Sequence, residues 1–271
     1  MPELPEVESV RRRLEPAMAR ERFERVIVRR PDLRTPFPAR FRARLTGETA
    51  LAVQRRAKYL VVPLSSGETL LMHLGMSGSF EVHTRDEEAE SDRHDHVVFH
   101  MSSGAIVTFN DPRRFGMMDL VPAGGFDTYP ALRALGPEPL SADFNPAALA
   151  RACKGKRTPL KVALLDQRVV AGLGNIYAVE ALHSAGLSPQ RRASTIATAS
   201  GAPRESAVRL AAAIKQVLAE AIARQSGAYR SSRFRVYDRE GERCRRPRCT
   251  GTIRRRTDAG RSTFFCSTCQ R

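Results

Sequence analysis

Four cysteines near the carboxyl end constrain the fold of this chain more than any other feature. They are spaced as Cys244-x4-Cys249-x16-Cys266-x2-Cys269. Two close pairs of thiols on a hairpin-length spacer suit tetrahedral zinc, because each pair spans one turn and the two turns can converge on one ion. The intervening GTIRRRTDAGRSTFF predicts two strands with a turn at Asp258. The spacing therefore predicts one structural Zn²⁺ in a β-hairpin finger, and no motif indicates a redox or nucleotide cofactor.

Free reactive thiols or disulfides are the alternative use of these cysteines. The remaining cysteine, Cys153, falls on the apolar face of a predicted helix and is expected to be a small buried hydrophobic residue. No signal peptide precedes Pro2, and no apolar run approaches the roughly 18 residues of a membrane span. We therefore expect a cytoplasmic chain without a membrane partner, in which disulfides are rare and zinc is the favoured interpretation.

The charge of the chain indicates a polyanionic partner. Lysine and arginine number 45 against 29 acidic residues, which gives a net charge of +16. Residues 230–271 contain 13 arginines, no lysine and four acidic residues, so more than half of the excess lies there. The planar arginine fork suits phosphate, and a basic excess of this size favours nucleic acid as the partner.

The order of sequence patterns predicts three parts in an α+β chain. Apolar residues at Val7, Val10, Leu14 and Met18 predict an amphipathic amino-terminal helix. Short β-rich segments separated by turns then run from about residue 24 to 122, as in a sandwich or barrel. Helical patterns follow, and we expect a β-domain at 1–130, a helical domain at 131–230 and the finger at 231–271.

Several short motifs are weak evidence when each is considered alone. Gly172 and Gly174 before a helix at Asn175 are either a packed turn or a phosphate site at a helix start. The segments HLGMSG and NDPRRFG could equally be ordinary turns, and QRRAKYL is expected to place Lys58 on a strand, where it could be an ordinary solvated lysine. Their common occurrence and order carry more information than their separate chemistry.

Taken together, these motifs closely resemble those of the formamidopyrimidine-DNA glycosylase family, bacterial enzymes that excise oxidised purines. PELPEVE, QRRAKYL, HLGMSG, HDH, NDPRRFG, LGPEPL, VAGLGNIYA and the finger ending CSTCQR occur here in the family order. The resemblance covers essentially the whole chain. It implies a β-sandwich with a leading helix, a helix–two-turn–helix domain and a zinc finger, acting as a monomer on damaged double-stranded DNA.

The amino terminus is suited to nucleophilic catalysis. Removal of Met1 is expected to expose Pro2, whose α-amine has a pKa near 8 against about 10.4 for lysine. More of this amine is therefore neutral at pH 7, and a secondary amine that attacks the sugar C1′ forms a cationic iminium. The alternative interpretation of PELPE is a helix start with acidic residues near the positive end of the helix dipole.

The resemblance assigns catalytic roles to matching positions. Pro2 is implied to be the nucleophile and Glu3 the adjacent acid–base, whereas Glu6 is expected to hold the amino terminus in place. Lys58 matches the lysine that supports base expulsion and β-elimination, and Arg261 matches the arginine that assists δ-elimination.

The resemblance also implies two kinds of DNA contact. One kind fills the space left by an everted base, with Arg113 facing the orphaned cytosine, and the other holds the DNA backbone. The residues in the first set are Met76, Arg113 and Phe115, and those in the second are His94, Arg113, Arg157, Asn175 and, as a weaker match, Lys161. An apolar wedge offsets part of the cost of unstacking a base, about a few kcal/mol.

The implied function is base-excision repair by a bifunctional glycosylase and abasic-site lyase, and two alternatives differ from it. An endonuclease VIII-like glycosylase would prefer oxidised pyrimidines, and a non-catalytic damage-binding module would need neither a free Pro2 nor Lys58. Two features depart from the family: residues 225–233 look about ten residues short, and the first cysteine pair is spaced by four residues rather than two. The short segment leads us to expect a broad lesion range.

Overall fold

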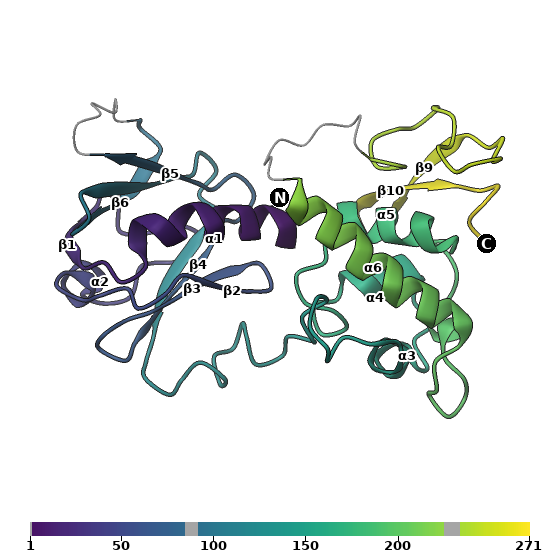
Figure 1. Ribbon diagram of the computed structural model, residues 1–271, viewed down its shortest axis with the longest axis horizontal. Coiled ribbons are helices and arrows are strands. Elements are labelled where there is room, and N and C mark those ends of the chain that lie inside the picture. The colour runs from purple at the N-terminus through teal and green to yellow at the C-terminus, as the bar shows by residue number, and fades with distance from the viewer. Residues whose placement is uncertain (1, 85–91, 225–233) are drawn as a thin grey trace. The chain divides into compact units, whose positions relative to one another are not determined.

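The computed structural model describes residues 2–84, 92–224 and 234–271 (Figure 1). The chain divides into two compact units, Met1–Arg133 and Ala134–Arg271. The expected helical domain and the expected finger therefore share the second unit. Among the described residues, no helix has the length and apolar character needed to cross a membrane.

Unit 1 (Met1–Arg133) is built on two four-stranded antiparallel sheets. Its strands are β1 (Phe23–Val28), β2 (Gln54–Arg56), β3 (Tyr59–Pro63), β4 (Thr69–His73), β5 (Ser79–Thr84), β6 (Asp95–Met101), β7 (Ala105–Asn110) and β8 (Met117–Val121). One sheet has the order β1-β6-β7-β5 and the other the order β2-β3-β4-β8. These strands lie within the β-rich range of about residues 24–122 that the sequence pattern predicts.

The core of unit 1 lies where the two sheets face each other. Phe99 and Phe109 come from the first sheet, Leu60 and Met72 come from the second, and all four belong to one buried cluster. Alternate residues of a strand point to the same face, and in β6 these are Val97, Phe99 and Met101, which all enter this core. The arrangement is the β-sandwich that the sequence predicts.

Helix α1 (Leu4–Met18) closes one side of the sandwich. It packs against β5 and β7 of one sheet and against β2 and β3 of the other (Figure 1). Its apolar stripe of Val7, Leu14 and Met18 is buried, as the helical spacing predicts. Unit 1 also contains the short helix α2 (Phe41–Leu45). Because α1 contacts both sheets, it fixes the start of the chain to both layers of unit 1.

Unit 2 (Ala134–Arg271) contains the helices that the second half of the sequence predicts. They are α3 (Pro146–Cys153), α4 (Leu160–Leu165), α5 (Asn175–Ala185), the 3-10 helix η1 (Ala193–Ile196) and α6 (Glu205–Ala223). Helix α5 is central, because it contacts α4, α6 and the finger strand β10 (Arg261–Cys266). Cys153 is fully buried and its burial raises the pKa of the thiol to about 11, in agreement with a structural role.

The finger is a β-hairpin of β9 (Ile253–Asp258) and β10. Its small core contains Val236, Ile253 and Phe264, together with Val179 from α5. Glu180 of the same helix accepts three consecutive backbone N–H groups, from residues 235–237, at 2.8–2.9 Å. Helix α5 therefore supplies both apolar and polar anchors for the finger.

Candidate functional site

The amino terminus is held in a defined conformation at the start of α1. Glu3 is the N-cap residue and forms a capping box with Glu6, whose carboxylate accepts the Glu3 backbone N–H at 2.9 Å. The Glu3 side chain is only 2% exposed, and Pro2 before it is partly exposed. Glu6 thus has the anchoring contact that was expected of it.

Lys58, which was expected on a strand, instead occupies a two-residue turn between β2 and β3. Arg56 and Tyr59 are the last paired residues of this hairpin, so Ala57 and Lys58 form its tip. Ala57 adopts a left-handed backbone conformation with φ 53°, which is uncommon for a residue with a side chain. Lys58 is 8% exposed, so the turn holds a largely buried lysine.

His73, at the end of β4, is a partly buried neighbour of Lys58. Burial, together with the positive charges of Lys58 and Arg34, lowers the pKa of His73 to about 4. Its Nδ1 accepts the Gly75 backbone N–H at 2.9 Å, which is the contact of a neutral imidazole. His73 therefore presents no second cation beside Lys58 near neutral pH.

Acid is expected to destabilise the protein through His73. The unfolded chain binds this proton near pH 6.5 and the folded chain only near pH 4, so the free energy of unfolding should fall as the pH decreases through this window. The contribution of one residue has a slope of up to about 1.4 kcal/mol per pH unit. Urea unfolding of the parent and of His73→Asn, which keeps an acceptor but cannot titrate, should show a shallower pH dependence in the variant. Equal slopes would contradict the assignment.

Met76, Arg113 and Phe115 lie on two neighbouring loops of unit 1 and project from its surface. Met76 is 43% and Phe115 is 40% exposed, so two large apolar side chains of these loops face solvent together. The Arg113 guanidinium lies 4.9 Å from the centre of the Phe115 ring. A side chain on Gly75 would clash with the backbone of Phe115, since a Cβ there would lie 2.2 Å from its carbonyl carbon.

Asp111 joins these two loops, and the sequence analysis did not identify it. It is fully buried and accepts the Ser77 hydroxyl at 2.6 Å and the Gly116 N–H at 2.7 Å. His94 is attached to the same cluster, because its carbonyl accepts the Asp111 N–H at 3.0 Å. An aspartate that precedes a Pro-Arg-Arg turn is the only sequence signal for this role.

In unit 2, Asn175 connects α5 to the finger. It begins α5 after Gly172, which has φ 77°, and its Nδ2 donates to the Ser262 carbonyl at 3.0 Å. Ser262 follows Arg261 in β10, so this hydrogen bond ties the start of α5 to the residue next to the finger arginine. Gln167 braces the glycine turn by accepting from Gly172 N–H.

Arg157 and Arg261 are exposed in unit 2, but Lys161 is not. Arg261 lines a hollow of about 480 Å³ together with Lys156, Asp166 and Arg168. Lys161 is 0% exposed. The expectation that Lys161 contacts DNA directly is therefore corrected, because a buried ammonium group cannot reach a phosphate outside the fold.

The four finger cysteines converge as the spacing predicts. Their sulfur atoms all lie within 4.8 Å of one another. Cys244 Sγ is 3.8 Å from Cys269 Sγ, and Cys249 Sγ is 3.7 Å from Cys266 Sγ. Four sulfurs around tetrahedral zinc, with Zn–S bonds of about 2.3 Å, lie about 3.8 Å apart. The donor set and its geometry therefore fit one structural Zn²⁺, and spacing the first pair by four residues does not prevent this.

His183 is a neighbour of the cysteine cluster that the sequence analysis missed. It is buried on α5, and its Nε2 lies 3.3 Å from Cys244 Sγ and 3.8 Å from Cys269 Sγ. A metal-bound thiolate only accepts hydrogen bonds, so Nε2 would donate to it. A histidine within an apolar helix gives no sequence signal for this contact. The segment 225–233, which looked short, lies outside the described residues.

Models of known protein families match segments of both units. Residues 1–118 match the Formamidopyrimidine-DNA glycosylase N-terminal domain, and residues 135–233 match the Formamidopyrimidine-DNA glycosylase H2TH domain. The formamidopyrimidine-DNA glycosylase of Rhodopseudomonas palustris strain HaA2 is 55% identical over 295 aligned residues that cover all of both chains. Because this chain has 271 residues, 24 positions of that alignment have no residue of this chain. The enzyme of the same name from Azorhizobium caulinodans is 54% identical with the same coverage.

Solved structures agree with these matches. The Lactococcus lactis formamidopyrimidine-DNA glycosylase, bound non-covalently to DNA with an abasic site, has a TM-score of 0.88 and 31% identity over all of both chains. The MutM (Fpg) protein of Thermus thermophilus has a TM-score of 0.83 and 40% identity over 99% of this chain and 98% of that one. With both family domains present and its relatives aligned from end to end, this chain belongs to the formamidopyrimidine-DNA glycosylase family.

Proposed function

We propose that this chain excises oxidised purines from duplex DNA and then cleaves the strand at the resulting abasic site. The observation that carries the proposal is the content of unit 1, in which a capped amino terminus, a buried lysine turn and an exposed Met–Arg–Phe cluster occur together. The end-to-end similarity to the Rhodopseudomonas palustris glycosylase supports the same function. An enzyme that repairs chromosomal DNA acts where that DNA is, which favours the bacterial cytosol.

Pro2 is the proposed nucleophile, in a chain from which Met1 has been removed. Its secondary amine attacks C1′ of the damaged nucleotide, the bond from C1′ to the base breaks, and the base leaves with a proton. The sugar ring opens to give an iminium at C1′. Glu3, buried next to Pro2, is proposed to protonate the opening ribose and to shuttle protons.

Strand cleavage follows from the charge of the iminium. It acidifies the C2′ proton, whose removal expels the 3′ phosphate by β-elimination, and a second elimination expels the 5′ phosphate. Lys58 is proposed to support base expulsion and the first elimination, and Arg261 the second. Water then hydrolyses the iminium and regenerates Pro2. The cysteine-bound zinc would hold the finger strand that carries Arg261 and takes no part in these steps.

Base eversion needs groups that replace the lost base. Met76 and Phe115 are proposed to enter the vacated stack, and Arg113 to hydrogen-bond the orphaned cytosine. Asp111 supports this role by joining the two loops. His94, Arg157 and Asn175 are proposed to hold the DNA backbone.

The decisive experiment compares duplexes that contain 8-oxoguanine opposite cytosine with duplexes that contain an oxidised thymine. Preferential cleavage of the first duplex supports the proposed purine specificity, and preference for the second favours an endonuclease VIII-like activity. The oxidised-thymine duplex is included because one similar structure is the Lactococcus lactis enzyme with DNA that contains an oxidised pyrimidine. Tight binding to either duplex without cleavage would indicate a damage-binding module instead.

Affinity for DNA is expected to fall steeply with salt. A protein that neutralises about six phosphates loses about 10³-fold in affinity between about 50 and 200 mM salt through counterion release. Arg157→Ala should weaken binding of all sequences and reduce the slope of log K against log salt by about 1. Lys215→Gln is the matched control, because it removes the same charge from a side chain bonded to the Ser141 carbonyl. A nearly flat salt dependence of the parent protein would show that its net charge is incidental to binding.

A further inference from the structure

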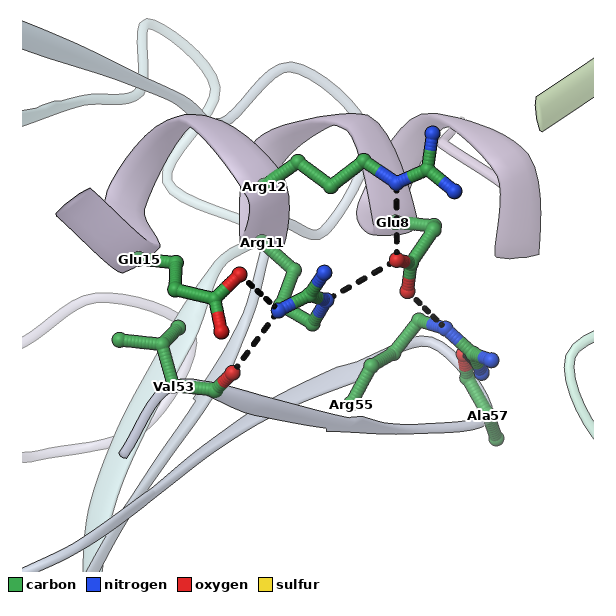
Figure 2. A network of polar contacts seen from close by, with 7 residues as sticks. All are labelled: Glu8, Arg11, Arg12, Glu15, Val53, Arg55 and Ala57. Carbon is green, nitrogen blue, oxygen red and sulfur yellow. Dashed lines mark hydrogen bonds and ion pairs between the residues drawn. The ribbon is translucent and has the colours of Figure 1, made fainter. Parts of the chain in front are cut away.

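An ion-pair network connects α1 to the strand that leads to Lys58 (Figure 2). Its centre is Glu8, whose Oε1 receives Arg11 Nε at 2.9 Å and Arg12 Nε at 3.2 Å. The other carboxylate oxygen, Oε2, receives Arg55 Nε at 3.1 Å. Glu8 and Arg55 are 47 residues apart in the chain, so this contact joins two separate elements of unit 1.

Arg55 also holds the turn that contains Lys58. Its Nη1 donates to the Ala57 carbonyl at 3.0 Å, and Figure 2 shows the side chain between Glu8 and this carbonyl. That carbonyl belongs to the peptide bond between Ala57 and Lys58. The turn is strained at Ala57, where the left-handed conformation costs about 1–2 kcal/mol. One guanidinium thus joins the amino-terminal helix to the backbone of the lysine turn.

The environment of this pair makes it stronger than an ordinary surface ion pair. The side chain of Glu8 is 14% exposed and that of Arg55 is 12% exposed. Burial by itself would raise the pKa of Glu8, but the hydrogen bonds and charges of Arg11 and Arg55 outweigh it, and the pKa is lowered. The carboxylate is therefore ionised near neutral pH, and a pair this shielded is little screened by salt.

We propose that Glu8 and Arg55 are positioning residues, which hold the Lys58 turn at a fixed place relative to the start of α1, where Pro2 and Glu3 lie. This inference rests on the proposed function of Pro2 and Lys58. Catalysis by two groups from different elements depends on their mutual placement, and a misplacement of about 1 Å can cost about 100-fold in rate. Neither Glu8 nor Arg55 is proposed to touch the DNA.

Arg12 provides a matched control within the same network. It binds the same carboxylate oxygen as Arg11, but its side chain is 47% exposed. Figure 2 shows it on the side of Glu8 away from Arg55 and Ala57. Removing Arg12 therefore takes one cation from Glu8 without loosening the lysine turn.

The test is single-turnover cleavage and borohydride trapping on DNA that already contains an abasic site, which removes base recognition from the measurement. Glu8→Gln keeps the shape of the side chain, and Arg55→Lys keeps its charge but lacks the separate donor nitrogens with which Arg55 bonds the carboxylate and the carbonyl. Each variant should lower both rates by about 10- to 100-fold. The dissociation constant for the same DNA and the thermal unfolding midpoint should stay near those of the parent. The double variant should be no slower than the slower single variant, and Arg12→Ala should match the parent.

Three results would overturn the inference. The first is parental rates in Glu8→Gln and Arg55→Lys, and the second is rates of the two single variants that multiply in the double variant. The third is a loss of rate matched by a loss of DNA affinity or of folded protein, which would assign the pair to stability. Failure of the proposed function would look different, because the parent protein itself would then not be trapped by borohydride.

Discussion

Borohydride is expected to trap this protein covalently on lesion-containing DNA only when the amine of Pro2 is free. The reagent reduces the iminium between that amine and C1′ to a stable bond. At pH 7 an α-amine with a pKa near 8 is about one-tenth neutral, whereas a lysine with a pKa near 10.4 is neutral in fewer than about one molecule in a thousand. A residue ahead of Pro2 converts its nitrogen into an amide, which has no nucleophilic lone pair. Loss of a catalytic nucleophile typically costs at least about 10⁴-fold in rate.

The sharpest form of this experiment uses one preparation with a removable amino-terminal extension. Before cleavage the protein should bind DNA but neither trap nor cut it, and after cleavage to expose Pro2 it should do both. Pro2→Gly should also trap poorly, because a primary amine gives a neutral imine that must be protonated before it can serve as an electron sink. Strong trapping by the extended protein would refute the role of Pro2 and direct attention to Lys58.

Features set by local pattern were predictable from the sequence. Helix α1 follows from the spacing of Val7, Leu14 and Met18, and the sandwich strands follow from short β-rich segments between turn residues. The cysteine cluster follows from spacing, since ligand pairs two to four residues apart can close on a metal. In each case the determinants lie within a few residues of one another, or have a chemistry with few alternatives.

Features that leave little local pattern, or that depend on contacts between distant segments, were not predictable. Strand β2 is three residues long and pairs on one side only, so it leaves almost no pattern. The contact between Glu8 and Arg55 and the contact between His183 and Cys244 join residues 47 and 61 positions apart. Lys161 was expected to contact DNA because it matches a family position, but the packing of α4 buries it.

Zinc removal is expected to have the second large effect, because the finger has too small a core to fold alone. That core contains only a few apolar side chains apart from the cysteines. Binding of structural zinc contributes about 10–16 kcal/mol in small zinc peptides, and this energy drives their folding. Chelation, or Cys266→Ser, should therefore unfold β9 and β10 and weaken DNA binding by at least about 100-fold, on the scale of losing several phosphate contacts. Unit 1, whose sandwich core contains no cysteine, should keep its thermal transition.

Cys153→Ala separates a metal effect from a general effect of removing a thiol. Cys153 is as buried as Cys266, but it lies in the helical core and outside the group of four cysteines. This variant should therefore retain one zinc per chain and parental DNA affinity, although it loses some stability to the cavity. Metal analysis of the active parent that finds much less than one zinc per chain would contradict the assignment. So would a chelated protein that still binds DNA tightly, because the exposed arginines of β9 and Arg261 of β10 depend on the hairpin for their placement.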